Sequence, residues 1–256
     1  MVAAGLLVAA CASPHPHAVG TTPAGHEIVQ IPLTWSNAFL IRSTPPTLID
    51  AGAGTNLREL QSALEAQQVE LEDIGLVILT HGHADHTGLA AELQRRGARV
   101  VLGEGDAGLA QRGANGPVPP MGLIARLLGL FVPKQYEAFA PNVRVTAELD
   151  LTPEGLAATV VPMPGHTAGS IAVLLPNHAA FVGDLVLGGS WGGRLSPHEP
   201  GEHYFHDDAE ANRRQLEALL ARGVETFYLG HGGPVRRADV LRAFALAEPQ
   251  GPTHGG

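Results

Sequence analysis

A dense group of potential metal ligands lies near position 80. It lies within six consecutive residues, His81-Gly82-His83-Ala84-Asp85-His86, of which the three histidines and the aspartate carry ligand atoms. They follow the apolar run Gly75 to Thr80, which is expected to form a buried strand. Three imidazoles and a carboxylate at a strand end are poor material for a core, but they are usual protein ligands of zinc and similar divalent ions. This stretch therefore predicts a metal site.

Further donors follow along the chain, each at or just after an apolar run. They are His166 in Pro164-Gly165-His166-Thr167, Asp184 after Phe181-Val182-Gly183, and His231 between Gly230 and Gly232. Seven donors exceed the four that one tetrahedral zinc takes, so two zinc ions per chain are expected, with iron or manganese as alternatives. The i, i+2 spacing of His81 and His83 suits an extended segment that presents both side chains to one ion.

Taken in order, the motifs Thr-His-x-His-x-Asp-His, Pro-Gly-His-Thr, Gly-Asp and Gly-His-Gly resemble those of the metallo-β-lactamase-fold hydrolases. The resemblance runs from about Glu27 to His231, which is most of the chain. It implies an α/β (α+β) fold built as a four-layer αββα sandwich, with a dinuclear metal site and a bridging hydroxide. In the ligand set that it implies, the first metal is held by His81, His83 and His166, the second by Asp85, His86 and His231, and Asp184 bridges the two.

Such a pair of ions would lower the pKa of bound water and polarise the bond under attack, so no serine or cysteine nucleophile is required. The sequence agrees, because it contains no Gly-x-Ser-x-Gly motif. Asp85 is the best candidate to orient the hydroxide or to pass its proton to the leaving group. Thr80, Thr167 or Asp50 could support the ligands, although Asp50 is equally well explained as a turn residue before Gly52.

The loop from Gly188 to Asp208 follows the bridging aspartate and is a candidate substrate wall. Its candidate substrate-binding residues are Trp191, Tyr204 and His206, and ordinary polarity of an exposed loop is the alternative. The expected reaction is hydrolysis of an ester, thioester, lactone or related bond in a small molecule.

Other branches of the family fit less well. β-Lactamases usually place Cys or Ser where Asp184 stands, and lactonases usually place Tyr where Leu187 stands. Glyoxalase-II-type thioesterases carry a further basic helical region, for which the 25 residues after His231 leave no room. A mononuclear iron oxidoreductase similar to the persulfide dioxygenases stays open, as do a β-lactamase-type amide hydrolase and a non-enzymatic binding module. The complete His86 and His231 pair favours a second metal over the iron enzyme.

Charge argues against a nucleic-acid partner. The 256 residues carry a net charge of −9, with Lys134 as the single lysine. Neutralising phosphates requires clustered basic residues, so a small molecule is the expected partner. The oligomeric state is left open.

The N-terminal segment resembles a bacterial lipobox. Cys11, the one cysteine, follows Leu7-Val8-Ala9-Ala10, which predicts a membrane tether through a lipidated cysteine in the cell envelope or periplasm. No basic residue precedes it and the apolar stretch is short, so a start codon assigned too far downstream, or an incidental cysteine in a cytoplasmic protein, are alternatives. The expected organisation is a signal and Pro-rich tether over 1–24, one domain over 25–247 and a tail over 248–256.

The elements that must position these residues alternate between strands and helices. Strands are expected at Glu27–Ile31, Ala38–Arg42, Thr47–Asp50, Gly75–Thr80, Arg99–Leu102, Ala157–Val161, Ile171–Leu175, Ala179–Val182 and Glu225–Leu229. Helices are expected at Thr55–Gln68, Thr87–Arg96, Asp208–Ala221 and Val235–Ala247. Residues 103–121 are expected to be irregular. The apolar segment Met121–Val132 is expected to be a helix that packs on the core, with a lid over the metals or a membrane-contacting patch as alternatives.

Overall fold

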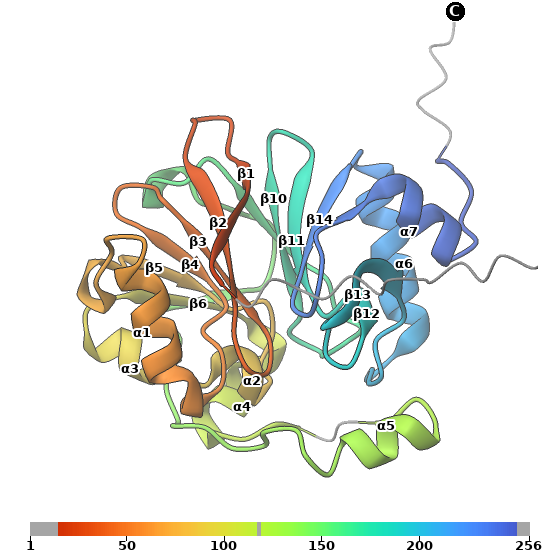
Figure 1. The fold of residues 1–256 in the computed structure, drawn as a ribbon, viewed down its shortest axis with the longest axis horizontal. Helices are drawn as coiled ribbons and strands as arrows, with labels where there is room; N and C mark the ends of the chain where they lie inside the picture. Colours follow the sequence, from red (N-terminus) through yellow and green to blue (C-terminus); the bar gives the residue numbers. More distant parts are fainter. Residues whose placement is uncertain (1–14, 117–118, 250–256) are drawn as a thin grey trace, which may run out of the picture.

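The computed structural model describes residues 15–116 and 119–249, which form two β-sheets packed face to face (Figure 1). The first sheet has seven strands in sequence order: β1 (His17–Thr21), β2 (Glu27–Pro32), β3 (Asn37–Ile41), β4 (Thr47–Ile49), β5 (Leu76–Ile78), β6 (Arg99–Gly103) and β7 (Val143–Val145). The strands from β1 to β4 pair antiparallel, and those from β4 to β7 pair parallel.

The second sheet has the order β15-β14-β11-β10-β9-β8. Its strands are β8 (Leu149–Asp150), β9 (Thr159–Pro162), β10 (Ile171–Leu175), β11 (Ala179–Gly183), β14 (Thr226–Leu229) and β15 (Val235–Arg236). Only the β11–β14 pair is parallel. A separate hairpin is formed by β12 (Leu187–Ser190) and β13 (Leu195–Gly201).

Helices cover the outer face of each sheet. The helices of the described residues are α1 (Leu57–Glu65), α2 (Ala84–Thr87), α3 (Ala90–Arg95), α4 (Ala107–Arg112), α5 (Leu123–Leu128), α6 (Ala209–Ala221) and α7 (Arg237–Ala243), with 3₁₀ turns η1 (Gly54–Asn56), η2 (Leu71–Asp73), η3 (Glu104–Asp106) and η4 (Thr152–Glu154). Figure 1 shows α1 and α3 outside the first sheet and α6 and α7 outside the second. This arrangement is the predicted four-layer αββα sandwich.

Strand periodicity explains how the first sheet serves two cores at once. In β3, Phe39 and Ile41 point into the core between the sheets, while Ala38 and Leu40 point into the core under α1 and α3. Successive side chains of a strand alternate between faces, so a strand buried on both sides has no polar alternation. A third apolar cluster lies between the second sheet and α6 and α7.

Most predicted elements are present, but several differ from expectation. The sheet begins with β1, so the predicted boundary of the domain at residue 25 is wrong: His17–Thr21 was assigned to the tether but pairs with β2. The predicted helix Thr87–Arg96 is divided into α2 and α3. The region 103–121, predicted to be irregular, contains α4.

The segment Met121–Val132 differs most. Its helix, α5, covers only Leu123–Leu128. Met121, Leu123 and Leu127 are exposed. Apolar composition predicted burial, whereas the structure places this segment at the surface (Figure 1).

The predictions for the chain ends lie largely outside the described residues. These are the lipobox with Cys11 and most of the tail over 248–256. The tether through Cys11 stays a prediction. Within 15–116 and 119–249, no helix combines the length and the apolar character needed to cross a membrane.

Candidate metal centre

The seven predicted ligands follow the ends of four strands. The group from His81 to His86 follows β5 in the first sheet. His166 follows β9, Asp184 follows β11 and His231 follows β14, all in the second sheet. Because loops at strand ends are held by a rigid scaffold, ligands from both sheets can meet in a fixed arrangement.

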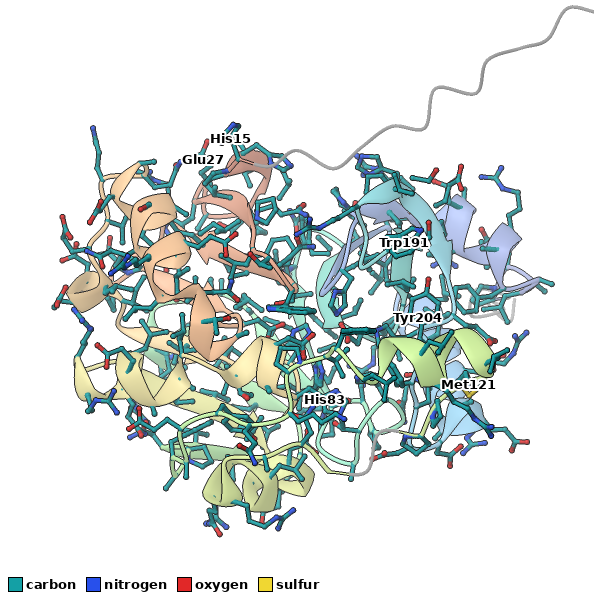
Figure 2. The ribbon with its side chains drawn as sticks, turned by 60° about the horizontal axis from the view of Figure 1, so that its bottom comes forward. His15, Glu27, His83, Met121, Trp191 and Tyr204 are labelled. Atoms are coloured by element: carbon teal, nitrogen blue, oxygen red, sulfur yellow. The ribbon has the colours of Figure 1, made fainter. Side chains whose placement is uncertain are left out.

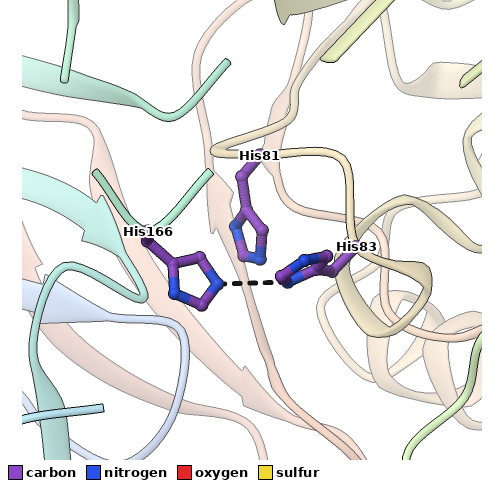
Figure 3. Close-up of side chains that lie close together, drawn as sticks. All are labelled: His81, His83 and His166. Atoms are coloured by element: carbon purple, nitrogen blue, oxygen red, sulfur yellow. Dashed lines mark hydrogen bonds between the residues drawn. The ribbon is translucent and has the colours of Figure 1, made fainter. Parts of the chain in front are cut away.

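The structure brings these side chains together in two sets. One ligand atom from each of His81, His83 and His166 lies within 4.8 Å of the other two, and the same holds for Asp85, His86 and His231. Figure 3 shows the three imidazoles of the first set turned toward one another, with His166 Nε2 3.1 Å from His83 Nδ1. The other nitrogen of His166 donates to the carbonyl oxygen of Phe205 at 2.9 Å, which directs Nε2 toward the centre.

Asp184 lies between the two sets. Its Oδ2 is 3.6 Å from His166 Nε2 and 3.3 Å from His231 Nε2, and its Oδ1 is 3.5 Å from His86 Nε2. One carboxylate thus faces imidazoles of both sets. This is the position that a carboxylate shared by two ions would occupy.

The buried donors lack partners that a metal would supply. His81 Nε2, His86 Nε2 and Asp184 Oδ1 are buried and have no hydrogen-bond partner among the described residues. Buried polar atoms in proteins are almost always bonded. Imidazole nitrogens and carboxylate oxygens are the ligands of zinc and of neighbouring transition metals, so the residues fit a divalent metal centre.

Burial and charge divide the imidazoles into two kinds. Burial lowers the pKa of His81, His83 and His166, and neighbouring imidazoles lower that of His81 further. These side chains are therefore neutral, which is the form that binds a metal. Burial also acts to lower the pKa of His86 and His231, but the carboxylates around them, Asp184 foremost, outweigh it and raise both values.

The carboxylate of Asp184 is held ionised. Burial acts to raise its pKa, but His231, His86 and His203 outweigh burial and bring the pKa well below its usual range. A carboxylate that is charged at all physiological pH values is suited to binding a cation.

Asp50 supports the centre from outside it. Its carboxylate accepts hydrogen bonds from the Thr80 backbone N–H at 2.7 Å, from Thr80 Oγ1 at 2.8 Å and from His86 Nδ1 at 2.8 Å. The last bond points His86 Nε2 at the centre, as carboxylates commonly do for metal-binding histidines. Asp50 also has a φ of +59°, a left-handed backbone conformation.

Asp106 joins two of the loops that carry metal donors. The sequence motifs do not predict this role. It accepts hydrogen bonds from the Gly82 N–H at 2.7 Å, from Thr167 Oγ1 at 2.6 Å and from the Gly169 N–H at 2.9 Å. The loops that carry His83 and His166 are thereby held against each other. Its partners are distant in sequence, so no local pattern announces this role.

Two glycines of the motifs are required by close approach. A Cβ at position 230 would lie 2.1 Å from Asp184 Oδ1 and 2.7 Å from His86 Cε1. Gly183 has a φ of +52°, and a Cβ there would lie 2.4 Å from Thr80 Oγ1. Larger residues at either position would displace the donors, which explains the Gly-Asp and Gly-His-Gly motifs.

Four of the seven donors, His83, Asp85, Asp184 and His231, line the floor of a cavity of about 400 Å³. Among the predicted substrate residues, Trp191 and Tyr204 line it, whereas His206 is buried and is not among the described lining residues. The ring centroid of His206 lies 5.6 Å from that of His166. Figure 2 shows His83 near the middle of this face of the molecule, with Tyr204 and α5 to one side.

His203 is a further donor that the predicted ligand set omits. Its Nε2 lies 3.2 Å from Asp184 Oδ2, and it forms a compact group with His166 and Asp184. Burial lowers the pKa of His203 to about 4, so its imidazole is neutral near pH 7. The sequence shows that His203 lies in the candidate substrate loop Gly188 to Asp208. Its contact with the metal donors depends on how the hairpin and this loop fold.

Comparison with known proteins agrees with this geometry. Residues 34–231 match the model of the metallo-beta-lactamase superfamily. A hydroxyacylglutathione hydrolase of Acidiphilium cryptum is 30% identical over 222 residues, which are 85% of this chain and 73% of that protein. A probable metallo-hydrolase of Bacillus subtilis, YqjP, is 51% identical over 53 residues, which are 20% of this chain and 17% of that protein.

Solved structures share the fold at lower identity. A metallo-beta-lactamase family protein from Thermus thermophilus aligns with a TM-score of 0.59 and 22% identity, covering 83% of this chain and 75% of its own. A metallo-beta-lactamase of Cronobacter sakazakii aligns with a TM-score of 0.57 and 19% identity, covering 85% and 79%. With its motifs, its layers and the match over residues 34–231 in agreement, the chain belongs to the metallo-beta-lactamase superfamily, whose members are metal-dependent hydrolases.

Proposed function

We propose that this metal-dependent hydrolase cleaves an ester, thioester or lactone bond in a small molecule, using two zinc ions. The observation that carries the proposal is the pair of donor sets that share Asp184 at the floor of the cavity. His81, His83 and His166 would hold one ion, and Asp85, His86 and His231 the other. Bound ions of this kind lower the pKa of water to near neutrality and polarise the carbonyl oxygen of a substrate.

Asp85 is suited to handle the proton. Its Oδ2 lies 3.6 Å from His231 Nε2 and 3.7 Å from His86 Nε2, and its side chain is 15% exposed and lines the cavity. Asp85 is more exposed than Asp184, whose side chain is 2% exposed, so it can contact a substrate and the ligands at once. We assign to it the orientation of the attacking water and the transfer of its proton to the leaving oxygen or sulfur.

A thioester is supported by one relative in particular. The protein of Acidiphilium cryptum that is 30% identical to this chain is named a hydroxyacylglutathione hydrolase. Hydrolysis of an acyl thioester and of an oxygen ester uses the same attack on a carbonyl, so the same donors would serve both.

The test of this function is the variant Asp85→Ala. We expect a loss of at least about 100-fold in kcat, because a positioned acid or base contributes that much or more. Circular dichroism and metal content, measured on the same sample, separate loss of chemistry from loss of the fold or of an ion. Asp150→Asn, an exposed carboxylate that bonds only Thr152 in the described structure, is the control.

Activity like that of the wild type in the Asp85→Ala variant would exclude the assigned role. The reaction class is tested by a screen over lactones, thioesters, phosphoesters and β-lactams with the zinc, manganese and iron forms compared. Two zinc ions per purified chain support the proposal, whereas a single iron would favour oxygen chemistry instead.

A further inference from the structure

The cavity above the metal donors has apolar and aromatic walls. Beyond its polar floor it is lined by Trp35, Phe131, Leu187, Trp191, Tyr204 and Phe205. Leu187 and Phe205 are buried, whereas Phe131 and Trp191 are 72% and 70% exposed. The walls therefore lead from a buried interior to an apolar opening.

Exposed apolar side chains concentrate at this opening. Among the described residues, the exposed large hydrophobic ones come from two segments only: Met121, Leu123, Leu127, Leu130, Phe131, Trp191 and Leu195. Of these, Phe131 and Trp191 line the cavity, one from each segment. Figure 2 shows Met121, Tyr204 and Trp191 on the face of the molecule that also carries His83. Contiguous exposed apolar surface on a protein commonly marks a binding site, whereas isolated apolar residues do not.

Backbone hydrogen bonds hold the first of these segments at the cavity. Near its start, the Met121 N–H donates to the Tyr204 carbonyl at 2.8 Å, and after its end the Asn115 N–H donates to the Lys134 carbonyl at 3.0 Å. Between them, Ala125 is buried, and a Cβ at Gly129 would lie 3.6 Å from Cε1 of the Phe205 ring. The small residue Ala125 thus faces inward, whereas Met121, Leu123, Leu127, Leu130 and Phe131 lie at the surface.

The second segment places a tryptophan in a costly conformation. Trp191 has a φ of +52° at the tip of the β12–β13 hairpin, a left-handed conformation that non-glycine residues seldom adopt. A large side chain that is both exposed and conformationally strained gains nothing for the fold. Such a residue indicates selection for contact with a ligand.

Charge limits what the walls can bind. Arg194 carries the only guanidinium or ammonium group among the described lining residues, and its Nη2 already donates to the Thr34 carbonyl at 2.9 Å. Asp85 and Asp184 would face the proposed ions, whose charge acts at the carbonyl under attack. Along the walls, away from those ions, further carboxylates of a substrate would meet no uncommitted cationic side chain among the described lining residues, whereas a neutral hydrocarbon chain needs none.

From these observations we propose that the cavity binds the hydrocarbon chain of an acyl substrate. The chain lies between Phe131, Trp191 and Tyr204, with its carbonyl at the donors, so the enzyme prefers medium or long acyl groups to short ones. This inference rests on the proposed function, and it names the substrate class. In the reaction, the hydroxyl of water bonds to the acyl carbon, the bond from that carbon to the ester oxygen or thioester sulfur breaks, and the leaving oxygen or sulfur takes the remaining proton of the water.

The first test measures hydrolysis of p-nitrophenyl esters from acetate to decanoate by the zinc-loaded full chain. Each methylene buried by the walls is expected to raise kcat/KM about fourfold until the cavity is filled. A flat or falling dependence on chain length would overturn the inference while leaving the hydrolase proposal intact.

The second test measures binding without hydrolysis. Trp35 and Trp191 are the only tryptophans of the chain and both line the cavity, so intrinsic fluorescence reports on this site alone. Alkyl methyl ketones from hexanone to dodecanone carry a carbonyl but no cleavable bond. An affinity that rises with the length of the ketone supports the inference, whether or not the protein hydrolyses the esters. If the protein hydrolyses none of the esters, that result contradicts only the proposed function.

A pair of variants tests where the hydrocarbon chain of the ligand binds. Phe131→Ser removes a lining residue, and we expect about tenfold weaker binding of 2-decanone. Leu123→Ser removes an exposed leucine of α5 that does not line the cavity, and binding is expected to stay within twofold of the wild type. An equal loss of affinity for 2-decanone in both variants, or no loss in Phe131→Ser, would place the hydrocarbon chain outside the cavity and contradict the proposal. Circular dichroism confirms that each variant is folded.

Discussion

Asp50 shows how one carboxylate couples the backbone to the metal donors. It fixes Thr80, the last residue before His81, by two hydrogen bonds, and it accepts a third from His86. Both ends of the ligand group that follows β5 are thus set by the same side chain. It does so from a left-handed conformation, which Asp and Asn tolerate better than other residues with a Cβ.

Asp50→Asn therefore isolates the charge of this residue from its backbone conformation. The amide can keep one hydrogen bond to Thr80 but loses the negative charge that faces His86. Carboxylates behind metal-binding histidines contribute about 10-fold to 100-fold in metal affinity, so we expect a loss in that range at one of the two ions. Competition with a chromophoric zinc chelator measures both dissociation constants.

Asp150→Asn is again the control, with no change expected in either constant. Unchanged affinities in Asp50→Asn would mean that the residue serves the turn before Gly52 and has no role in metal binding. A loss at both ions together would assign the effect to displacement of the whole loop that follows β5.

At the scale of the elements, ordered apolar runs predicted the strands that deliver ligands. Gly75–Thr80 and Ala179–Val182 are examples in which an uninterrupted apolar run is a strand buried on both faces. The β12–β13 hairpin was not predicted, because its strands, which are only partly buried, are rich in Gly, Pro and polar residues and show no apolar alternation. For Met121–Val132, the apolar composition correctly predicted a helix but wrongly predicted that it packs on the core. Periodicity does not say which surface an apolar face contacts.

The tip of that hairpin offers a test of stability. At most positions Gly destabilises a protein by about 0.5–1 kcal/mol relative to Ala. At Trp191, where φ is positive, we expect the reverse: Trp191→Gly should exceed Trp191→Ala in unfolding free energy by about 1 kcal/mol, since Gly adopts this conformation without strain.

Urea denaturation of the two variants measures this difference, and both should bind 2-decanone more weakly than the wild type. The same side chain is removed in each, so packing effects cancel in the comparison. An Ala variant as stable as the Gly variant would show that the hairpin tip relaxes and that Trp191 carries no strain.

At the scale of the whole molecule, the site depends on contacts between residues that are far apart in the sequence. The motifs revealed seven donors, but the roles of Asp106 and His203 depend on partners that only the packed sheets bring near. Pro120 pairs with Phe205, so the chain before α5 is held to the loop that carries His203. No local pattern encodes such pairings, because each joins segments that are distant in sequence.

The donors come from both sheets, so bound metal would link the two halves of the sandwich. His83 is delivered by the first sheet, and His166, Asp184 and His231 by the second. An ion that binds only the folded chain stabilises it by mass action, by about 2.7 kcal/mol when its free concentration is 100 times the dissociation constant. Without metal, buried donor atoms such as His81 Nε2 and Asp184 Oδ1 have no hydrogen-bond partner among the described residues, which adds to the loss.

We therefore expect removal of metal by a chelator to lower the free energy of unfolding by about 3 kcal/mol or more, and readdition of zinc to restore it. Urea denaturation at fixed free zinc, with and without chelator, measures the difference. Asp184→Asn should shrink this difference because it weakens the donor that both sets share, whereas Asp150→Asn should not. Equal stability of the metal-free and zinc-loaded wild type would mean that the seven donors do not bind an ion across the sheets, and the proposed mechanism would lose its basis.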